Sequence, residues 1–202
     1  MRFIAYNLNA DRLCLGERLK GGVFRISSET IPYSQIRGAI ERNLGFSVHA
    51  VGVIDSVEGI KHLAIGPKSR FTDMVRLPIK IMYLEGVKGR IYIIDEGNLS
   101  NSLEDNMFLY LGGARTKGIG KCFLSERRLI EIKEKDFGYG YLRTRIPMEV
   151  AGSFGITVLQ EKLGYLFMPE DEETGRYVLS YFEGSKVRGP KILIEGGEEN
   201  AK

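Results

Sequence analysis

The stretch from Leu111 to Lys121 constrains this chain more than any other, because four glycines and three basic residues share eleven positions. Glycine reaches backbone conformations that other residues avoid, and it allows a ligand to approach the backbone closely. Such a loop can direct several N–H groups at an anion, and Arg115, Lys117 and Lys121 would add full positive charge. We therefore predict a rigid anion-binding loop held between two apolar segments.

A structural interpretation of the same loop stays open, in which Gly112 and Gly113 end a helix while Gly118 and Gly120 form a turn. The loop is not a Walker A motif, since no Gly-Lys-Ser/Thr closes it. Nor does it match a dinucleotide fingerprint, whose glycines follow a strand and open a helix. The loop alone does not decide the function.

The charge distribution supports an anionic partner. The whole chain of 202 residues carries a formal net charge of only +3. Between residues 112 and 145, however, nine lysines and arginines face four acidic residues. A polyanion should prefer this segment, although a solvated basic face would give the same count.

Cysteine content and hydropathy indicate in which cellular compartment the protein works. Cys14 and Cys122 cannot form a zinc site alone, and a chain with 43% hydrophobic residues needs no disulfide. No apolar run approaches membrane-spanning length, and the N-terminus lacks a signal-peptide pattern. We expect a cytoplasmic protein with buried thiols, no membrane contact, no metal and no cofactor.

Periodicity predicts an α+β fold. Ile36, Ile40 and Leu44 form a helical stripe that ends at Gly45, and Leu103 to Leu111 has the spacing of a second helix. Alternating segments predict strands at 2–6, 23–26, 46–55, 60–65, 78–84, 90–94 and 121–124. Without the extra hairpin strands the order is β-α-β-β-α-β, the ferredoxin-like (RRM-like) antiparallel sheet with two helices. We expect this domain at 1–125, a β-rich appendage packed on it at 126–195, and a flexible tail at 196–202.

Two motifs together resemble the CRISPR-associated RAMP superfamily. Residues 31–40, Ile-Pro-Tyr-Ser-Gln-Ile-Arg-Gly-Ala-Ile, resemble the segment that opens the first helix of that superfamily, with Tyr33 in place of its usual glycine. Residues 111–120 resemble its glycine-rich loop, and both motifs fall in the expected order. Val150 to Phe154 resembles the Ala-Gly-Ser element of the larger subunits that cap the 5′ handle of the guide RNA.

The resemblance implies a protein that binds RNA backbone, with other CRISPR effector subunits and crRNA or CRISPR repeat RNA as partners. Carried over, glycine N–H groups would meet phosphates and the cations would neutralise them, while Tyr139 and Tyr141 are candidates for base stacking. The residues implied in RNA binding are Ser34, Arg37, Gly38, Gly112, Gly113, Arg115, Lys117, Gly118, Gly120 and Lys121.

The resemblance also raises the question of catalysis. Metal-independent RNA cleavage needs a base and an acid, and His49 follows the first helix, near where repeat-cleaving RAMP nucleases often carry a histidine. Tyr33 and Lys61 could assist it, whereas a histidine on a strand is often structural. Three hypotheses follow: a non-catalytic guide-RNA-binding subunit, an endoribonuclease that processes CRISPR repeat RNA through His49, and a β-rich interaction domain that binds no RNA.

Overall fold

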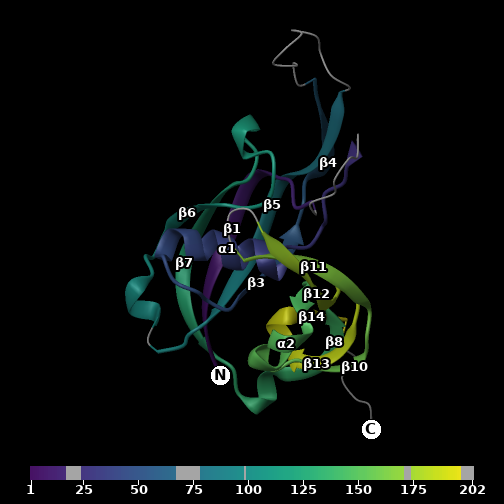
Figure 1. The fold of residues 1–202 in the computed structure, drawn as a ribbon. Helices are drawn as coiled ribbons and strands as arrows, with labels where there is room; N and C mark the ends of the chain where they lie inside the picture. The colour runs from purple at the N-terminus through teal and green to yellow at the C-terminus, as the bar shows by residue number, and fades with distance from the viewer. Residues whose placement is uncertain (17–23, 67–77, 98, 171–173, 197–202) are drawn as a thin grey trace.

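One long strand, β5, lies at the centre of the largest of the sheets in the computed structural model, which describes residues 1–16, 24–66, 78–97, 99–170 and 174–196 (Figure 1). That sheet contains β1 (Arg2–Leu13), β2 (Phe24–Arg25), β3 (Ala50–Ser56), β4 (Gly59–Ile65), β5 (Ile79–Ile94), β6 (Met107–Tyr110) and β7 (Lys121–Glu131). A second sheet contains β8 (Phe137–Leu142), β10 (Thr157–Gln160), β13 (Lys186–Pro190) and β14 (Ile194–Glu195). A third contains β9 (Ile146–Pro147), β11 (Leu163–Pro169) and β12 (Gly175–Tyr181).

Helices are few in the described part of the chain. The α-helices are α1 (Tyr33–Leu44) and the single turn α2 (Met148–Ala151). Short 3₁₀ turns lie at Leu99–Ser102, Arg115–Lys117, Glu134–Asp136, Gly152–Phe154 and Lys191–Leu193. Within these residues no helix is long and apolar enough to cross a membrane.

The four inner strands lie in the order β3-β5-β1-β7, and each neighbouring pair is antiparallel. Helix α1 connects β1 to β3, as the first helix of a ferredoxin-like unit does. The α+β class and this antiparallel sheet confirm the prediction from periodicity, and β2, β4 and β6 are the additional strands.

The second helix, expected over Leu103 to Leu111, was wrong. Residues Met107–Tyr110 form the edge strand β6, which pairs with β7 from Met107 opposite Leu124 to Tyr110 opposite Lys121. Leu109 is buried while its neighbours Phe108 and Tyr110 are exposed, so the segment alternates with the period of a strand. In so short a segment helical and alternating patterns overlap, and pairing with β7 decides between them.

Strand β1 is covered on both faces of the central sheet, and its side chains alternate between two buried clusters. Ile4, Tyr6 and Leu8 lie in the cluster that includes Ile36 and Ile40 of α1. Both isoleucines of α1 are fully buried, which contributes about 1.5–3 kcal/mol each. The opposite face holds a second cluster that joins β1, β3 and β5 to residues from Ile132 to Ile194. The two halves of the sequence therefore share a core.

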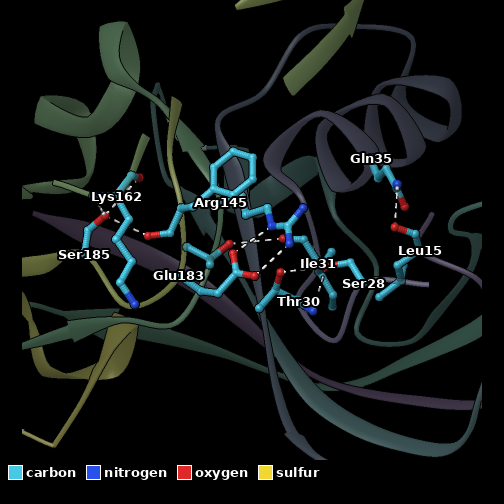
Figure 2. A network of polar contacts seen from close by, with 11 residues as sticks. Leu15, Ser28, Thr30, Ile31, Gln35, Arg145, Lys162, Glu183 and Ser185 are labelled. Carbon is cyan, nitrogen blue, oxygen red and sulfur yellow. Dashed lines mark hydrogen bonds and ion pairs between the residues drawn. The ribbon is translucent and has the colours of Figure 1, made fainter. Parts of the chain in front are cut away.

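Backbone contacts beside an ion pair also join the halves. Within the second half, Arg145 donates two hydrogen bonds of 2.7 Å to the carboxylate of Glu183 (Figure 2) and stacks on Phe182. The backbone N–H of Tyr33 donates to the carbonyl of Arg145 at 3.0 Å, beside the start of α1. The division into 1–125 and 126–195 stays a proposal, and β7 runs through its boundary to Glu131.

Candidate functional site

A cleft of about 480 Å³ lies between α1, the glycine-rich loop and β11. We call it the α1 cleft. Its walls include Ser34, Gly38 and Arg42 of α1, Gly112, Gly113 and Arg115 of the loop, and Phe167 of β11. The structure thus brings together the two motifs that lie far apart in the sequence.

The α1 wall follows from helical geometry. Ser34, Gly38 and Arg42 are spaced by four residues and share one face, while Ile36 and Ile40 are buried on another. A Cβ placed on Gly38 would meet no atom within 4 Å, so packing does not require glycine there. This glycine weakens the helix by about 1 kcal/mol relative to alanine and leaves the cleft open.

The glycine-rich loop is fixed to β1 and to the residue after it, Cys14, by two close approaches. Gly112 has φ +71°, and a Cβ there would lie 2.1 Å from the carbonyl oxygen of Cys14. Gly120 has φ +98°, and its N–H donates to the carbonyl of Arg12 at 2.8 Å. Both positions therefore demand glycine, and the loop is held rigidly.

Three of the four glycine N–H groups expected to bind an anion are bonded within the protein instead. The N–H of Gly113 donates to Cys14, that of Gly118 to Arg115 and that of Gly120 to Arg12, all at 2.8–3.1 Å to carbonyl oxygens. These N–H groups are bonded to backbone carbonyls and are not available to an anion. These three glycines instead shape the loop that carries Arg115, whose Nε donates to the carbonyl of Gly112.

No described carboxylate neutralises the charge of the α1 cleft. Arg115 donates through Nε to the carbonyl of Gly112 at 3.1 Å. Burial, and then the charge of Arg42, lower the pKa of the Arg115 guanidinium. Among the described residues neither arginine has a carboxylate partner, and Arg25 also lines the cleft. An anion placed here would relieve the repulsion between Arg42 and Arg115.

A larger cavity, of about 720 Å³, also contains arginines, but they are paired. Arg143 lies 3.0 Å from Asp55 and 3.6 Å from Glu195, and Arg145 is paired with Glu183. Burial opposes ionisation of Asp55, but the hydrogen bonds and charges of Arg90 and Arg143 together lower its pKa. This cavity is the larger of the two, but its arginines are already paired. The α1 cleft, whose arginines have no carboxylate partner among the described residues, is therefore the better candidate for an anion site.

Three predicted RNA-binding cations lie outside the α1 cleft. Arg37 donates to Glu41 at 2.8 Å and to Ser47 at 3.0 Å. The ammonium of Lys121 lies 4.5 Å from the centre of the Phe108 ring. Lys117 is exposed in the 3₁₀ turn that follows the cleft residues. Their part in RNA binding stays a proposal.

Of the catalytic candidates, the structure brings together only Tyr33 and His49. The Tyr33 hydroxyl lies 2.7 Å from Nδ1 of His49, and both rings contact Phe154. Burial raises the pKa of Tyr33 to about 12. Lys61 of β4 pairs with Glu85 of β5. At roughly 3.3 Å per residue along β5, Lys61 lies on the order of 30 Å from His49. Lys61 therefore cannot assist His49 at one site.

The remaining motif residues lie in the second half of the chain. Tyr139 and Tyr141 are 48% and 46% exposed on one face of β8, so both rings are open to solvent in a different sheet. The Ala-Gly-Ser element forms α2 and the turn after it, and places Phe154 in the core beneath Tyr33.

Sequence reasoning missed Arg25, Arg42 and Phe167. Arg42 carries a usable signal, because it continues the four-residue spacing of Ser34 and Gly38 along α1. Phe167 carries none, because β11 reaches the cleft only through the fold of the second half. Arg25 likewise depends on the parallel pairing of β2 with β5.

Fold and cleft together define an antiparallel α+β protein of ferredoxin-like topology with a basic cleft, whose arginines have no carboxylate partner in the described part of the chain. No known family model matches the sequence, and no curated protein matches it either. The fold is similar to that of a chain in the cryo-EM structure of the Type III-B Cmr-beta bound to cognate target RNA and AMPPnP, state 1, at 12% identity and a TM-score of 0.61. A chain in the structure of Cmr-beta bound to cognate target RNA gives 13% and 0.55.

Each match covers 93% of this chain and 86% of the other, so the likeness spans both halves of the fold. At these identities the likeness concerns the fold alone. It confirms, at the level of fold, the resemblance drawn from the two motifs. The subgroup that caps the 5′ handle stays a proposal.

Proposed function

We propose that this chain binds the sugar-phosphate backbone of a guide RNA (crRNA) in the α1 cleft, as a non-catalytic subunit of a CRISPR effector complex. The observation that carries the proposal is the convergence of both motifs on one cleft whose arginines lack carboxylate partners among the described residues. Phosphate contacts of this kind position an RNA without reading its sequence. The fold likeness to chains of Type III-B Cmr-beta supports the same assignment.

The 5′-handle-capping role is the form of this function that we favour, because the Ala-Gly-Ser element stands after the glycine-rich loop as in that group. The other RAMP-like role, cleavage of repeat RNA, would require His49 to act without Lys61. His49 is instead partly buried and bonded to Tyr33, as a structural histidine would be.

The test measures binding of labelled single-stranded CRISPR repeat RNA to the full chain at increasing salt. For single strands, log K falls with log salt at a slope of about −0.7 for each phosphate that the protein neutralises. Arg42→Gln and Arg115→Gln should each weaken binding and make the slope shallower by about that amount. Arg176→Gln is the matched control, because this exposed arginine is paired with Glu149 and Glu170.

The proposal fails if the wild-type chain binds no RNA, or if Arg42→Gln and Arg115→Gln bind like Arg176→Gln. The same reactions, run in EDTA and analysed on a denaturing gel, test catalysis. Intact RNA supports the non-catalytic role, whereas specific cleavage that disappears in His49→Ala would assign the endoribonuclease role.

A further inference from the structure

A second, smaller pocket of about 260 Å³ continues the α1 cleft at the C-terminal end of α1. It is lined by Ala39, Arg42 and Asn43 of α1, Tyr110 of β6 and Arg115. Ala39, Arg42 and Arg115 line both cavities, so a chain lying in the cleft can extend into this pocket. Pockets that hold whole small ligands measure about 300–1,000 Å³, so this one suits a single flat group of a larger molecule.

Tyr110 gives the pocket an open aromatic face. It is 49% exposed on the edge strand β6, and among the described residues its ring and hydroxyl have no partner. Its neighbour Phe108 is different, since that ring packs 5.0 Å from Phe123 and carries the ammonium of Lys121. The one aromatic ring of β6 that lines the pocket is thus free to stack on an incoming planar group.

Asn43 adds polar groups whose orientation is fixed. Its Nδ2 donates to the carbonyl of Phe108 at 2.9 Å, which ties α1 to β6 and sets which end of the amide is the carbonyl. One N–H and the Oδ1 atom are left to bond another molecule. A donor and an acceptor side by side match the hydrogen-bonding edge of a nucleobase.

The two arginines supply the anchor for such a group. Arg42 and Arg115 flank the pocket without carboxylate partners among the described residues, and each repels the other. A phosphate between them would place the base attached to it at the mouth of the pocket. Aromatic faces beside a basic groove are the usual means of holding single-stranded nucleic acid.

We propose that this pocket is a nucleobase subsite, in which one base of a bound single-stranded RNA stacks on Tyr110 while its phosphate lies between Arg42 and Arg115 and Asn43 bonds its edge. The inference rests on the proposed function and extends it from backbone to base. It assigns Tyr110, Asn43 and Arg42 to a binding surface that neither sequence motif contains.

The experiment compares a short oligouridylate with an abasic sugar-phosphate chain of the same length, both bound to the full chain in the same salt. Stacking on an aromatic side chain is lost on substitution by alanine, so Tyr110→Ala should weaken binding of the oligouridylate by about 5- to 100-fold. Binding of the abasic chain should stay unchanged, and Tyr110→Phe should behave like wild type. Tyr165→Ala is the control, because Tyr165 is 61% exposed on β11 and does not line the pocket.

The outcomes separate the two proposals. Equal loss for both ligands would make Tyr110 a structural residue, and no loss for either would leave the pocket to another partner such as a protein segment; each result overturns the subsite alone. If the wild-type chain binds neither ligand in a salt-dependent way, the proposed function fails and the subsite fails with it.

Discussion

Tyr33 and His49 form a structural pair between α1 and the start of β3, and both rings contact Phe154 of the second half. The Tyr33 side chain is fully buried, and its hydroxyl lies 2.7 Å from His49 in the described structure. His49→Ala would remove this partner of the hydroxyl and the ring contact with Phe154, and we expect the free energy of unfolding to fall by about 1–3 kcal/mol in urea titrations.

His62→Ala is the control for this change, because His62 is exposed on β4 and stacks only on the exposed Phe24 among the described residues. Exposed substitutions of that kind usually shift stability by less than about 0.5 kcal/mol. A His49→Ala chain as stable as the His62→Ala chain would show that the pair is not structural.

The structural role of Gly112 can be tested by comparison with Gly118. Gly112→Ala meets two costs, a positive φ of 71° and a Cβ only 2.1 Å from the Cys14 oxygen. Gly118→Ala meets the first alone, since φ is 74° and no atom lies within 4 Å. We expect Gly118→Ala to lose about 1–2 kcal/mol in the free energy of unfolding and Gly112→Ala clearly more. Equal losses would mean that the loop is not fixed against β1.

At the scale of elements, local pattern predicted α1 well and β6 badly. The α1 stripe runs over three turns and ends at Gly45, whose N–H donates to Glu41 at 2.7 Å in a left-handed cap. The segment from Leu103 to Leu111 offered only a few apolar positions, which suit either period. Its true state depends on β7, a partner that local spacing does not contain.

The α1 wall of the cleft yields a prediction of its own. Gly38→Ala should raise the free energy of unfolding by about 0.5–1 kcal/mol, because the site is helical and open. Gly38→Glu would put a carboxylate four residues before Arg42, where the two can pair. We expect it to weaken RNA binding well beyond Gly38→Gln, which has the same size without the charge. Equal binding by these two variants would remove Arg42 from the proposed site.

For the whole molecule, the motifs located two walls of the α1 cleft but not its chemistry. The sequence showed that glycines and cations cluster, yet not that Gly113 and Gly120 would donate to β1 and the residue after it while Arg37 turned to Glu41. Those outcomes depend on which carbonyls and carboxylates the fold brings near. The wall at Phe167 comes from a strand far beyond the loop in the sequence. Burial and pairing, which are properties of the folded chain, separated the cations proposed to bind from those already neutralised.

The contact between Arg145 and Glu183 shows how the shared core responds to acid. Burial, the largest single influence, opposes ionisation of Glu183. The hydrogen bonds and charge of Arg145, a backbone N–H and Thr30 together outweigh it and hold the pKa of that carboxyl below its ordinary 4.5. A carboxyl with a lowered pKa in the folded state stabilises the fold fully above its unfolded value. That contribution is lost as the pH falls through the folded value. The free energy of unfolding should therefore decline below about pH 4.5 in part through this residue.

Glu183→Gln isolates the contribution, because glutamine keeps the shape and one acceptor but cannot ionise. At neutral pH the variant should be less stable than wild type, since Arg145 loses a charged partner within the second half of the chain. As the pH is lowered past about 4.5, the difference between the two urea unfolding free energies should shrink toward zero. A Glu149→Gln chain gives the baseline, because that exposed carboxylate lies 3.9 Å from Arg176 and should show almost no difference at any pH. If the Glu183→Gln difference stays constant down to acid pH, the ionised pair with Arg145 does not stabilise the fold as described.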